Sequence, residues 1–139
     1  MRDEELIQLA TDVRARAYVP YSNFRVGAAL LAASGRVYTG CNIENEAYSP
    51  TICAERVAIG SAIAAGEEPG KEGTFTAIAV VGAKSVPTSP CGVCRQVLFE
   101  LAPGLRVIMA VAPEKGEGIL EKSVEELLPW GFHLNDEQR

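Results

Sequence analysis

Three cysteines in two motifs far apart along the chain constrain this fold more than any other sequence feature. Cys53 begins one apolar helical segment, and Cys91 and Cys94 begin another. Because Cys91 and Cys94 are three positions apart, both thiols point the same way from a first helical turn. The three sulfur atoms converge only in a fold that brings two helix N-termini together.

These thiols predict a metal site rather than disulfide bonds. The segment 1–5 is charged and no apolar signal region follows it, while the longest strongly apolar run, residues 26–33, spans only eight residues. We therefore expect a cytoplasmic protein without a membrane segment, where disulfides rarely persist. Helix N-termini favour thiolates, and zinc with three protein ligands and one water is the usual catalytic arrangement. Cys53, Cys91 and Cys94 are thus expected to bind Zn²⁺.

Charged residues beside the two motifs predict how such a site would work. Glu55 follows Cys53 by two residues, in a helix that is otherwise almost entirely apolar. A glutamate in a first helical turn is usually an ordinary surface residue, but beside a zinc ligand it suits general acid/base catalysis. Three thiolates and one Zn²⁺ sum to a net negative charge. Arg56 and Arg95, each directly after a motif, are therefore candidates to offset it.

Cys41 leaves an alternative, in which four thiols close the zinc site and merely hold the fold. Such structural sites usually consist of two closely spaced cysteine pairs. Here only Cys91 and Cys94 are close in sequence, and Cys41 ends an expected strand. We expect Cys41 to be a small buried apolar side chain instead.

The order of helical and strand patterns predicts an α/β fold in a single domain, residues 1–139. The first helix would be capped by Asp3 and stopped by Pro20. The connection 113–118 is too short for a crossover helix, so the last two strands must be antiparallel. Helices on both faces of a five-stranded mixed sheet then give three layers, α/β/α. The expected strands are 25–33, 37–41, 76–82, 106–112 and one near Ile119, and the later helices are 53–65, 91–101 and a short one with a capping box from Ser123 and Glu126.

Charge and patterning also restrict the partners. The net charge is −5 and no basic stripe is present, so we expect no nucleic-acid partner.

The polar stretch 42–52 is long enough to be a site loop. The helix 53–65 is apolar almost all round, which suggests contact with another subunit.

These motifs closely resemble the cytidine deaminases, specifically the small homotetrameric, zinc-dependent type, along nearly the whole chain. A Cys-x-Glu motif with Pro-Cys-x-x-Cys is already fairly specific for zinc-dependent deaminases. The resemblance implies the cytidine-deaminase-like three-layer fold. The matching segments are 20–24, 26–30, 40–45, 53–56, 89–96 and 126–129, with Phe132.

The resemblance further implies hydrolytic deamination of cytidine and deoxycytidine to uridine and deoxyuridine plus ammonia, a step of pyrimidine salvage. Glu55 would take a proton from water, pass it to N3 of cytosine and later protonate the leaving amino group. Arg56 would offset the third thiolate. The implied substrate contacts are Phe24 on the pyrimidine, Asn42 and Glu44 on the ribose hydroxyls, the Ala54 backbone on the base, and Tyr48 and Phe132 reaching into an adjacent subunit's site.

One position departs from the family pattern. Glu46 stands where the family usually has a small residue whose backbone amide helps to bind the ribose 5′-hydroxyl. Glu44 and Glu46 together place negative charge near the ribose, which favours nucleosides over nucleotides. Three alternatives remain: the same chemistry on an aminonucleoside antibiotic or a free base, a non-catalytic zinc or binding module, and a nucleic-acid deaminase. The acidic balance argues against the last of these.

Overall fold

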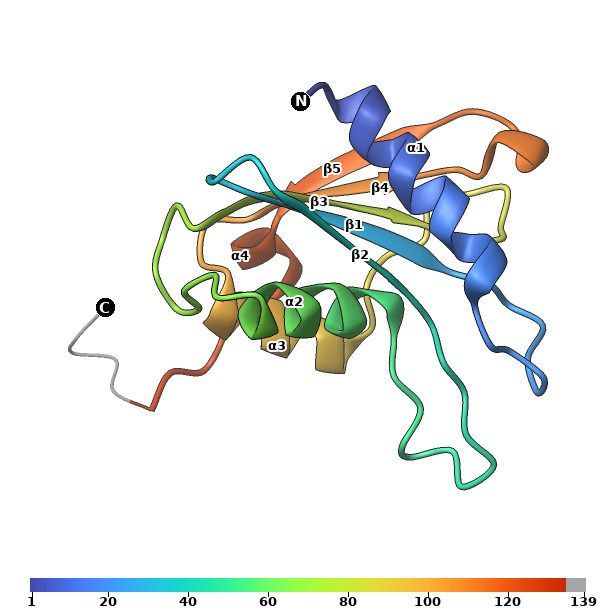
Figure 1. Cartoon of the computed structure of the whole chain (residues 1–139), viewed down its shortest axis with the longest axis horizontal. Coiled ribbons are helices and arrows are strands. Elements are labelled where there is room, and N and C mark those ends of the chain that lie inside the picture. The colour runs from blue at the N-terminus through green and yellow to red at the C-terminus, as the bar shows by residue number, and fades with distance from the viewer. Residues whose placement is uncertain (135–139) are drawn as a thin grey trace.

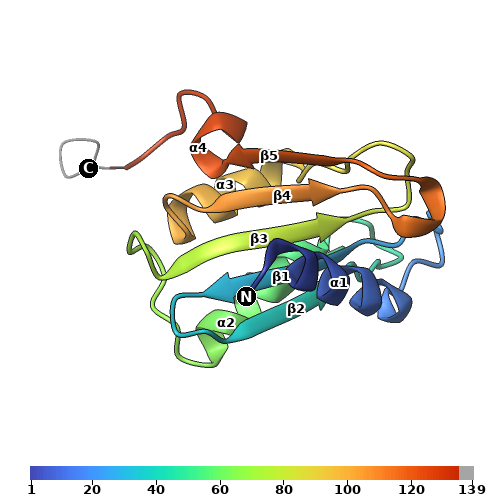
Figure 2. The same cartoon turned by 90° about the horizontal axis from the view of Figure 1, so that it is seen from above.

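The computed structural model describes residues 1–134 as a sheet between two helical layers (Figure 1). Helix α1 (Asp3–Val13) covers one face of the sheet, and Figure 2 shows it crossing above β1. Helices α2 (Ala54–Ala64), α3 (Gly92–Leu101) and α4 (Val124–Leu127) lie on the other face. The three-layer prediction is confirmed. The strands are β1 (Gly27–Ala32), β2 (Val37–Cys41), β3 (Phe75–Val81), β4 (Arg106–Ala110) and β5 (Ile119–Ser123).

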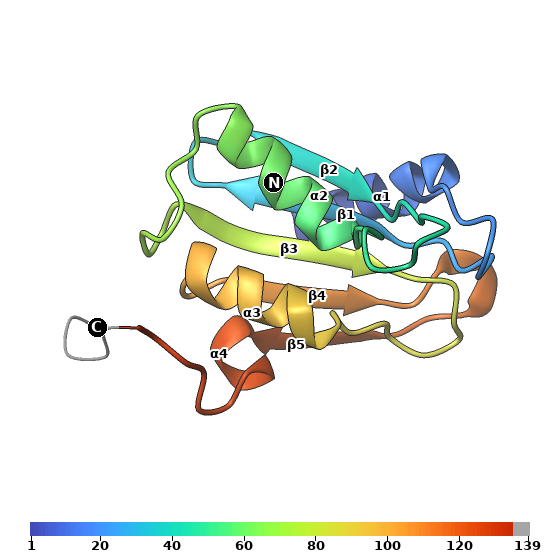
Figure 3. The ribbon, with the colours of Figure 1, turned by 90° about the horizontal axis from the view of Figure 1, so that it is seen from below.

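Strand directions decide where the helices begin. The sheet order is β2-β1-β3-β4-β5, and β1 is antiparallel to both β2 and β3. The strands β2 and β3 therefore run in the same direction and end at the same edge of the sheet. Strand β4 is parallel to β3, and β5 returns antiparallel to β4, as its short connection predicted. Because α2 follows β2 and α3 follows β3, both helices begin at this edge and lie side by side (Figure 3).

The three central strands, β1, β3 and β4, are buried on both faces of the sheet, whereas β5 at the edge is largely exposed. Six of the seven residues of β3 are buried, as expected of a central strand covered by helices. Between the sheet and α2, α3 and α4 the core is built from large side chains such as Leu30, Ile59, Ile78 and Leu98. The core under α1 is smaller and rich in alanine. None of the helices within residues 1–134 is long and apolar enough to cross a membrane.

The helix termini confirm one predicted cap and correct another. Ser123 and Glu126 form the predicted capping box at α4. Asp3 is not a cap, because it is the first residue of α1 and Arg2 occupies the N-cap position without a side-chain hydrogen bond. The Asp3 carboxylate instead accepts a hydrogen bond from Arg106, at 2.9 Å. Helix α1 also ends well before Pro20, because a 3₁₀ turn follows it.

A glycine sets how closely α2 approaches the sheet. A Cβ atom on Gly40 of β2 would lie 2.4 Å from the Ala54 carbonyl oxygen and 2.6 Å from the Ala58 nitrogen. Only glycine permits this contact between strand and helix backbones. Since Ala54 is the first residue of α2, the contact fixes the position of the helix start.

Gly40→Ala is therefore expected to destabilise the protein by about 1–3 kcal/mol, the usual cost of overpacking. The control is Thr39→Ala, at the exposed neighbour of Gly40 on β2. Truncating this exposed side chain should change stability by no more than about 0.5 kcal/mol. Denaturant unfolding at one fixed chain concentration measures both. Equal effects of the two substitutions would show that the close approach at Gly40 does not matter.

Candidate active site

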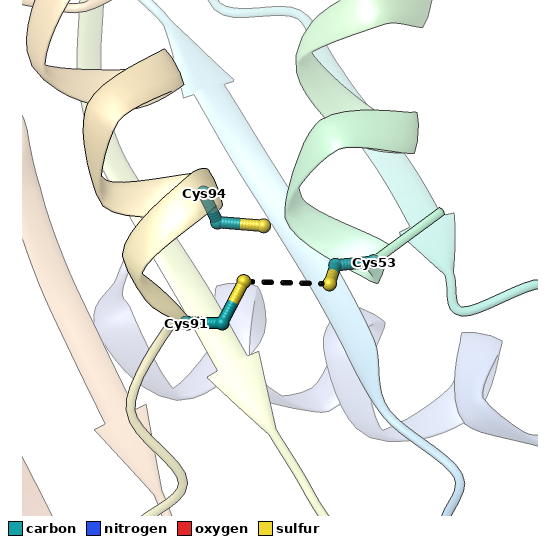
Figure 4. A group of neighbouring side chains, drawn as sticks. All are labelled: Cys53, Cys91 and Cys94. Carbon is teal, nitrogen blue, oxygen red and sulfur yellow. Dashed lines mark hydrogen bonds between the residues drawn. The ribbon is translucent and has the colours of Figure 1, made fainter. Parts of the chain in front are cut away.

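Three thiols meet between the starts of α2 and α3 (Figure 4). Cys53 and Cys91 are the N-cap residues of the two helices, one position earlier than the helices begin, and both have extended backbone. Cys94 is buried in the first turn of α3. The Sγ atoms of Cys53 and Cys91 are 3.7 Å apart, and all three Sγ atoms lie within 4.8 Å of one another. The structure thus brings together the three thiols that the sequence singled out.

The donor set and its spacing fit zinc. A tetrahedral ion with Zn–S bonds of about 2.3 Å needs sulfur atoms roughly 3.8 Å apart, close to the Cys53–Cys91 distance. A hydrogen bond from Cys94, helped by Arg56, lowers the pKa of the Cys53 thiol to about 5, whereas the same contact and burial raise the pKa of Cys94. Cys53 is therefore the thiol that ionises first, and Cys94 would lose its proton when a metal binds. Within residues 1–134 no other group of three His, Cys, Asp or Glu side chains is close enough to share an ion. Cys41 lies outside this cluster, half-buried, so a closed four-cysteine site is excluded.

Glu55 lies beside the thiols and is almost completely buried. It is the one charged residue among residues 1–134 with a buried side chain, 3% exposed. Burial raises the pKa of Glu55 to about 7, and the nearby Cys53 adds to this rise. A carboxyl group with a pKa near neutrality can both accept and donate a proton, which is what general acid/base catalysis requires.

Arg56 and Arg95 differ in what they contact. The Arg56 Nη2 atom donates to the Cys53 sulfur at 3.6 Å and to the Thr51 carbonyl at 3.4 Å. The Arg95 guanidinium donates to the carbonyls of Pro90 and Leu127 and to the Ser89 hydroxyl instead. Arg56 therefore places its positive charge against the Cys53 sulfur, whereas Arg95 binds oxygen atoms.

A cavity of about 290 Å³ opens over the thiols. Its walls come from four segments that meet at one sheet edge: the approach to β1, the loop after β2, the start of α2 and the loop before α3. The cavity therefore places small-molecule-sized space against two of the three thiols, those of Cys53 and Cys91, and against a buried carboxyl group. The predicted site residues among its lining are Phe24, Asn42, Glu44, Cys53, Ala54, Glu55 and Cys91.

Asn42 and Glu44 also hold the cavity wall in place. The Asn42 side chain accepts a hydrogen bond from the Val26 amide at 2.9 Å and donates to the Phe24 carbonyl at 2.7 Å. Glu44 accepts from the amides of Tyr21 and Ser22 and from the Ser22 hydroxyl, and the Ser22 hydroxyl chiefly lowers the pKa of this carboxyl. Each side chain keeps hydrogen-bonding capacity for a further partner.

Three predicted substrate contacts lie outside the cavity of their own chain. Glu46 is exposed on the site loop. Tyr48, 72% exposed and with a positive φ of 63°, packs edge-on against Tyr21 with ring centroids 5.9 Å apart. Phe132, 68% exposed, follows α4. Exposed aromatic side chains of this kind are available to a neighbouring molecule.

The cavity also uses residues that sequence reasoning did not single out. Ser22 binds Glu44, Thr88 and Ser89 form part of the wall, and the Lys84 ammonium lies 5.7 Å from the centre of the Phe24 ring. Thr88 and Ser89 stand directly before the second cysteine motif, and this proximity to the motif could have identified them as site residues. The contacts of Ser22 and Lys84 join residues distant in sequence, so no local pattern reports them.

The fold and the site define a zinc-binding deaminase domain. The family model described as "Cytidine and deoxycytidylate deaminase zinc-binding region" matches residues 1–110, so the chain belongs to this family. A cytidine deaminase of Sporosarcina psychrophila is 47% identical over 133 residues, covering 96% of this chain and 93% of that protein. A cytidine deaminase of Mycobacterium tuberculosis is 41% identical over 128 residues, covering 91% and 86%.

Solved structures of the same family share the architecture. A crystal structure of cytidine deaminase from Burkholderia pseudomallei matches with a TM-score of 0.88 at 47% identity, covering 95% of this chain and 100% of that chain. The cytidine deaminase from Mycobacterium tuberculosis matches with a TM-score of 0.76 at 37% identity, covering 96% and 100%.

Two cysteine substitutions test the ligand set. We expect Cys41→Ser to retain one zinc ion per chain, because Cys41 lies outside the thiol cluster. Cys94→Ser should lose tightly bound zinc, because it removes the buried ligand. Elemental analysis of purified, dialysed protein measures both. Loss of zinc from Cys41→Ser would restore the closed four-cysteine site.

Proposed function

We propose that this protein is a cytidine deaminase that hydrolyses cytidine and deoxycytidine to uridine and deoxyuridine with release of ammonia. The observation that carries the proposal is the buried Glu55 carboxyl beside three converging thiols, at one cavity. A purely structural zinc site would need neither the cavity nor a buried carboxyl group. The cytidine deaminases of similar sequence and structure support the same activity.

The mechanism follows from the chemistry of the residues around the cavity. Cys53, Cys91 and Cys94 would hold a zinc ion, which would activate a water molecule for attack. Glu55 accepts a proton from this water and delivers it to N3 of the pyrimidine. The hydroxide left behind adds to C4. Glu55 then moves the proton of the new C4 hydroxyl to the amino group, the C4–N bond breaks, and ammonia leaves as the C4 carbonyl forms. Arg56 offsets the excess negative charge of three thiolates through its contact with Cys53.

Nucleoside recognition is assigned to the cavity wall. Phe24 packs on the pyrimidine ring, and the Ala54 backbone hydrogen-bonds the base. Asn42 and Glu44 use their remaining hydrogen-bonding capacity on the ribose hydroxyls. The Glu46 backbone amide is assigned to the 5′-hydroxyl.

We further infer a homotetramer with shared active sites, in which Tyr48 and Phe132 enter the site of an adjacent subunit. Their exposure supports this, since large exposed aromatic side chains mark interaction surfaces. The exposed face of α2 carries only small residues, Gly60, Ser61 and Ala64, which permit close subunit contact. Four free cysteines suit the reducing cytoplasm, where the reaction would serve pyrimidine salvage.

Glu55→Gln tests the catalytic assignment. The substitution keeps size but removes proton transfer, so turnover of cytidine should fall by at least about 10²–10⁴-fold while one zinc ion per chain is retained. The matched control is Glu100→Gln, an exposed glutamate on α3, which should leave turnover unchanged. The measurements are the loss of absorbance near the cytidine maximum, equimolar ammonia release and zinc content. Zinc-loaded wild-type protein that turns over no pyrimidine would leave a binding function instead.

Charge at the ribose end predicts selectivity for nucleosides. Glu44 is ionised, and Glu46 lies two residues further along the same loop. A 5′-phosphate would be repelled, so kcat/KM for CMP should fall at least about tenfold below that for cytidine, a difference of roughly 1.4 kcal/mol. Replacing the second carboxylate, Glu46→Ala, should narrow the difference. Comparable kcat/KM values for the two substrates in the wild-type protein would contradict this prediction.

A further inference from the structure

Arg95 uses all three side-chain nitrogens to join two segments around α3. Its Nε donates to the Pro90 carbonyl at 2.8 Å, and its Nη2 donates to the Ser89 hydroxyl at 3.2 Å. Its Nη1 donates to the Leu127 carbonyl at 3.0 Å, at the end of α4. Both Ser89 and Pro90 belong to the loop that leads into Cys91. Arg95 therefore ties the loop carrying a metal ligand to the C-terminal part of the chain.

Of the three thiols, that of Cys91 depends most on its loop for its position. Cys94 is buried, Cys53 is half-buried and contacted by Arg56, but Cys91 is exposed. Packing therefore restrains its thiol least. The Pro90 carbonyl and the Cys91 amide share one planar peptide unit. Holding this carbonyl fixes the plane from which the Cys91 side chain projects.

Leu127, which accepts a hydrogen bond from Arg95, begins a segment that packs on α3 at further points. Phe99 is four positions after Arg95, so both side chains lie on the same face of the helix. Phe99 stacks on His133 with ring centroids 4.7 Å apart, and Gly131 lies directly against the Phe99 ring. Arg95 and Phe99 together hold residues 127–133 along α3.

We propose that Arg95 is a positioning residue that locks the Ser89–Cys91 loop, and so the Cys91 ligand, against the end of α4. It acts through the backbone of the loop, whereas Arg56 acts on a sulfur atom. This role rests on the proposed function only in taking the three thiols as the zinc ligands. The role of Arg95 does not depend on which substrate is deaminated.

The test is the rate at which zinc passes from the zinc-loaded protein to an excess of the chromogenic chelator pyridylazoresorcinol. Arg95→Gln should release zinc about 10–100-fold faster, the usual effect of losing a partner that orients a metal ligand. Arg95→Lys should restore only part of the difference, because an ammonium cannot reproduce three divergent contacts. The matched control Arg106→Gln removes surface ion pairs with Asp3 and Glu121 and should leave the rate unchanged.

A double-mutant cycle separates this role from general destabilisation. Ser89→Ala alone should accelerate release modestly, and should add nothing in the Arg95→Gln background, because the same contact is already lost. If Arg95→Gln does not fold, Ser89→Ala and Arg95→Lys decide the question, and unchanged release from both would overturn the proposal. Full rescue by Arg95→Lys would also overturn it, since charge alone would then suffice. Failure of the zinc-loaded wild type to deaminate cytidine would sink the proposed function but leave this release measurement intact.

Discussion

The site depends on one topological constraint, the antiparallel placement of β1 between β2 and β3. Because β1 opposes both neighbours, β2 and β3 end at the same edge, and the helices that follow them begin there together. Gly40 then permits α2 to sit directly on β2. Without this arrangement the Cys53 thiol would not come within reach of the thiols on α3.

Two opposing effects set the pKa values at this edge of the sheet: burial, and contact with neighbouring charged or hydrogen-bonding groups. Burial raises the pKa of Glu55 to about 7, while Cys94 and Arg56 lower the pKa of Cys53 to about 5. Arg56 adds positive charge on the side of Cys53. The result is a carboxyl group with a pKa near neutrality beside three converging thiols, at a cavity of small-molecule size.

The sequence predicted those parts that depend on local spacing. The Cys91–Cys94 interval, the short 113–118 connection and the Ser123–Glu126 capping box each specify local geometry, and each is confirmed or has its expected consequence. Asp3 is not the predicted cap because α1 already begins at Asp3, and its carboxylate binds a distant partner, Arg106. For the same reason the bond between Ser22 and Glu44 and the three-way contact of Arg95 could not be read from local patterns. The resemblance of the motifs indicated the family. The tertiary contacts show how the site residues are held in place.

The central claim is that three thiolates bind zinc and leave its fourth position for water, beside Glu55. X-ray absorption spectroscopy of the zinc-loaded protein tests this most directly. The account predicts three sulfur ligands at about 2.3 Å and one oxygen ligand at about 2.0 Å. Four sulfur ligands with no oxygen would contradict it, because no position would remain for the water that attacks the substrate.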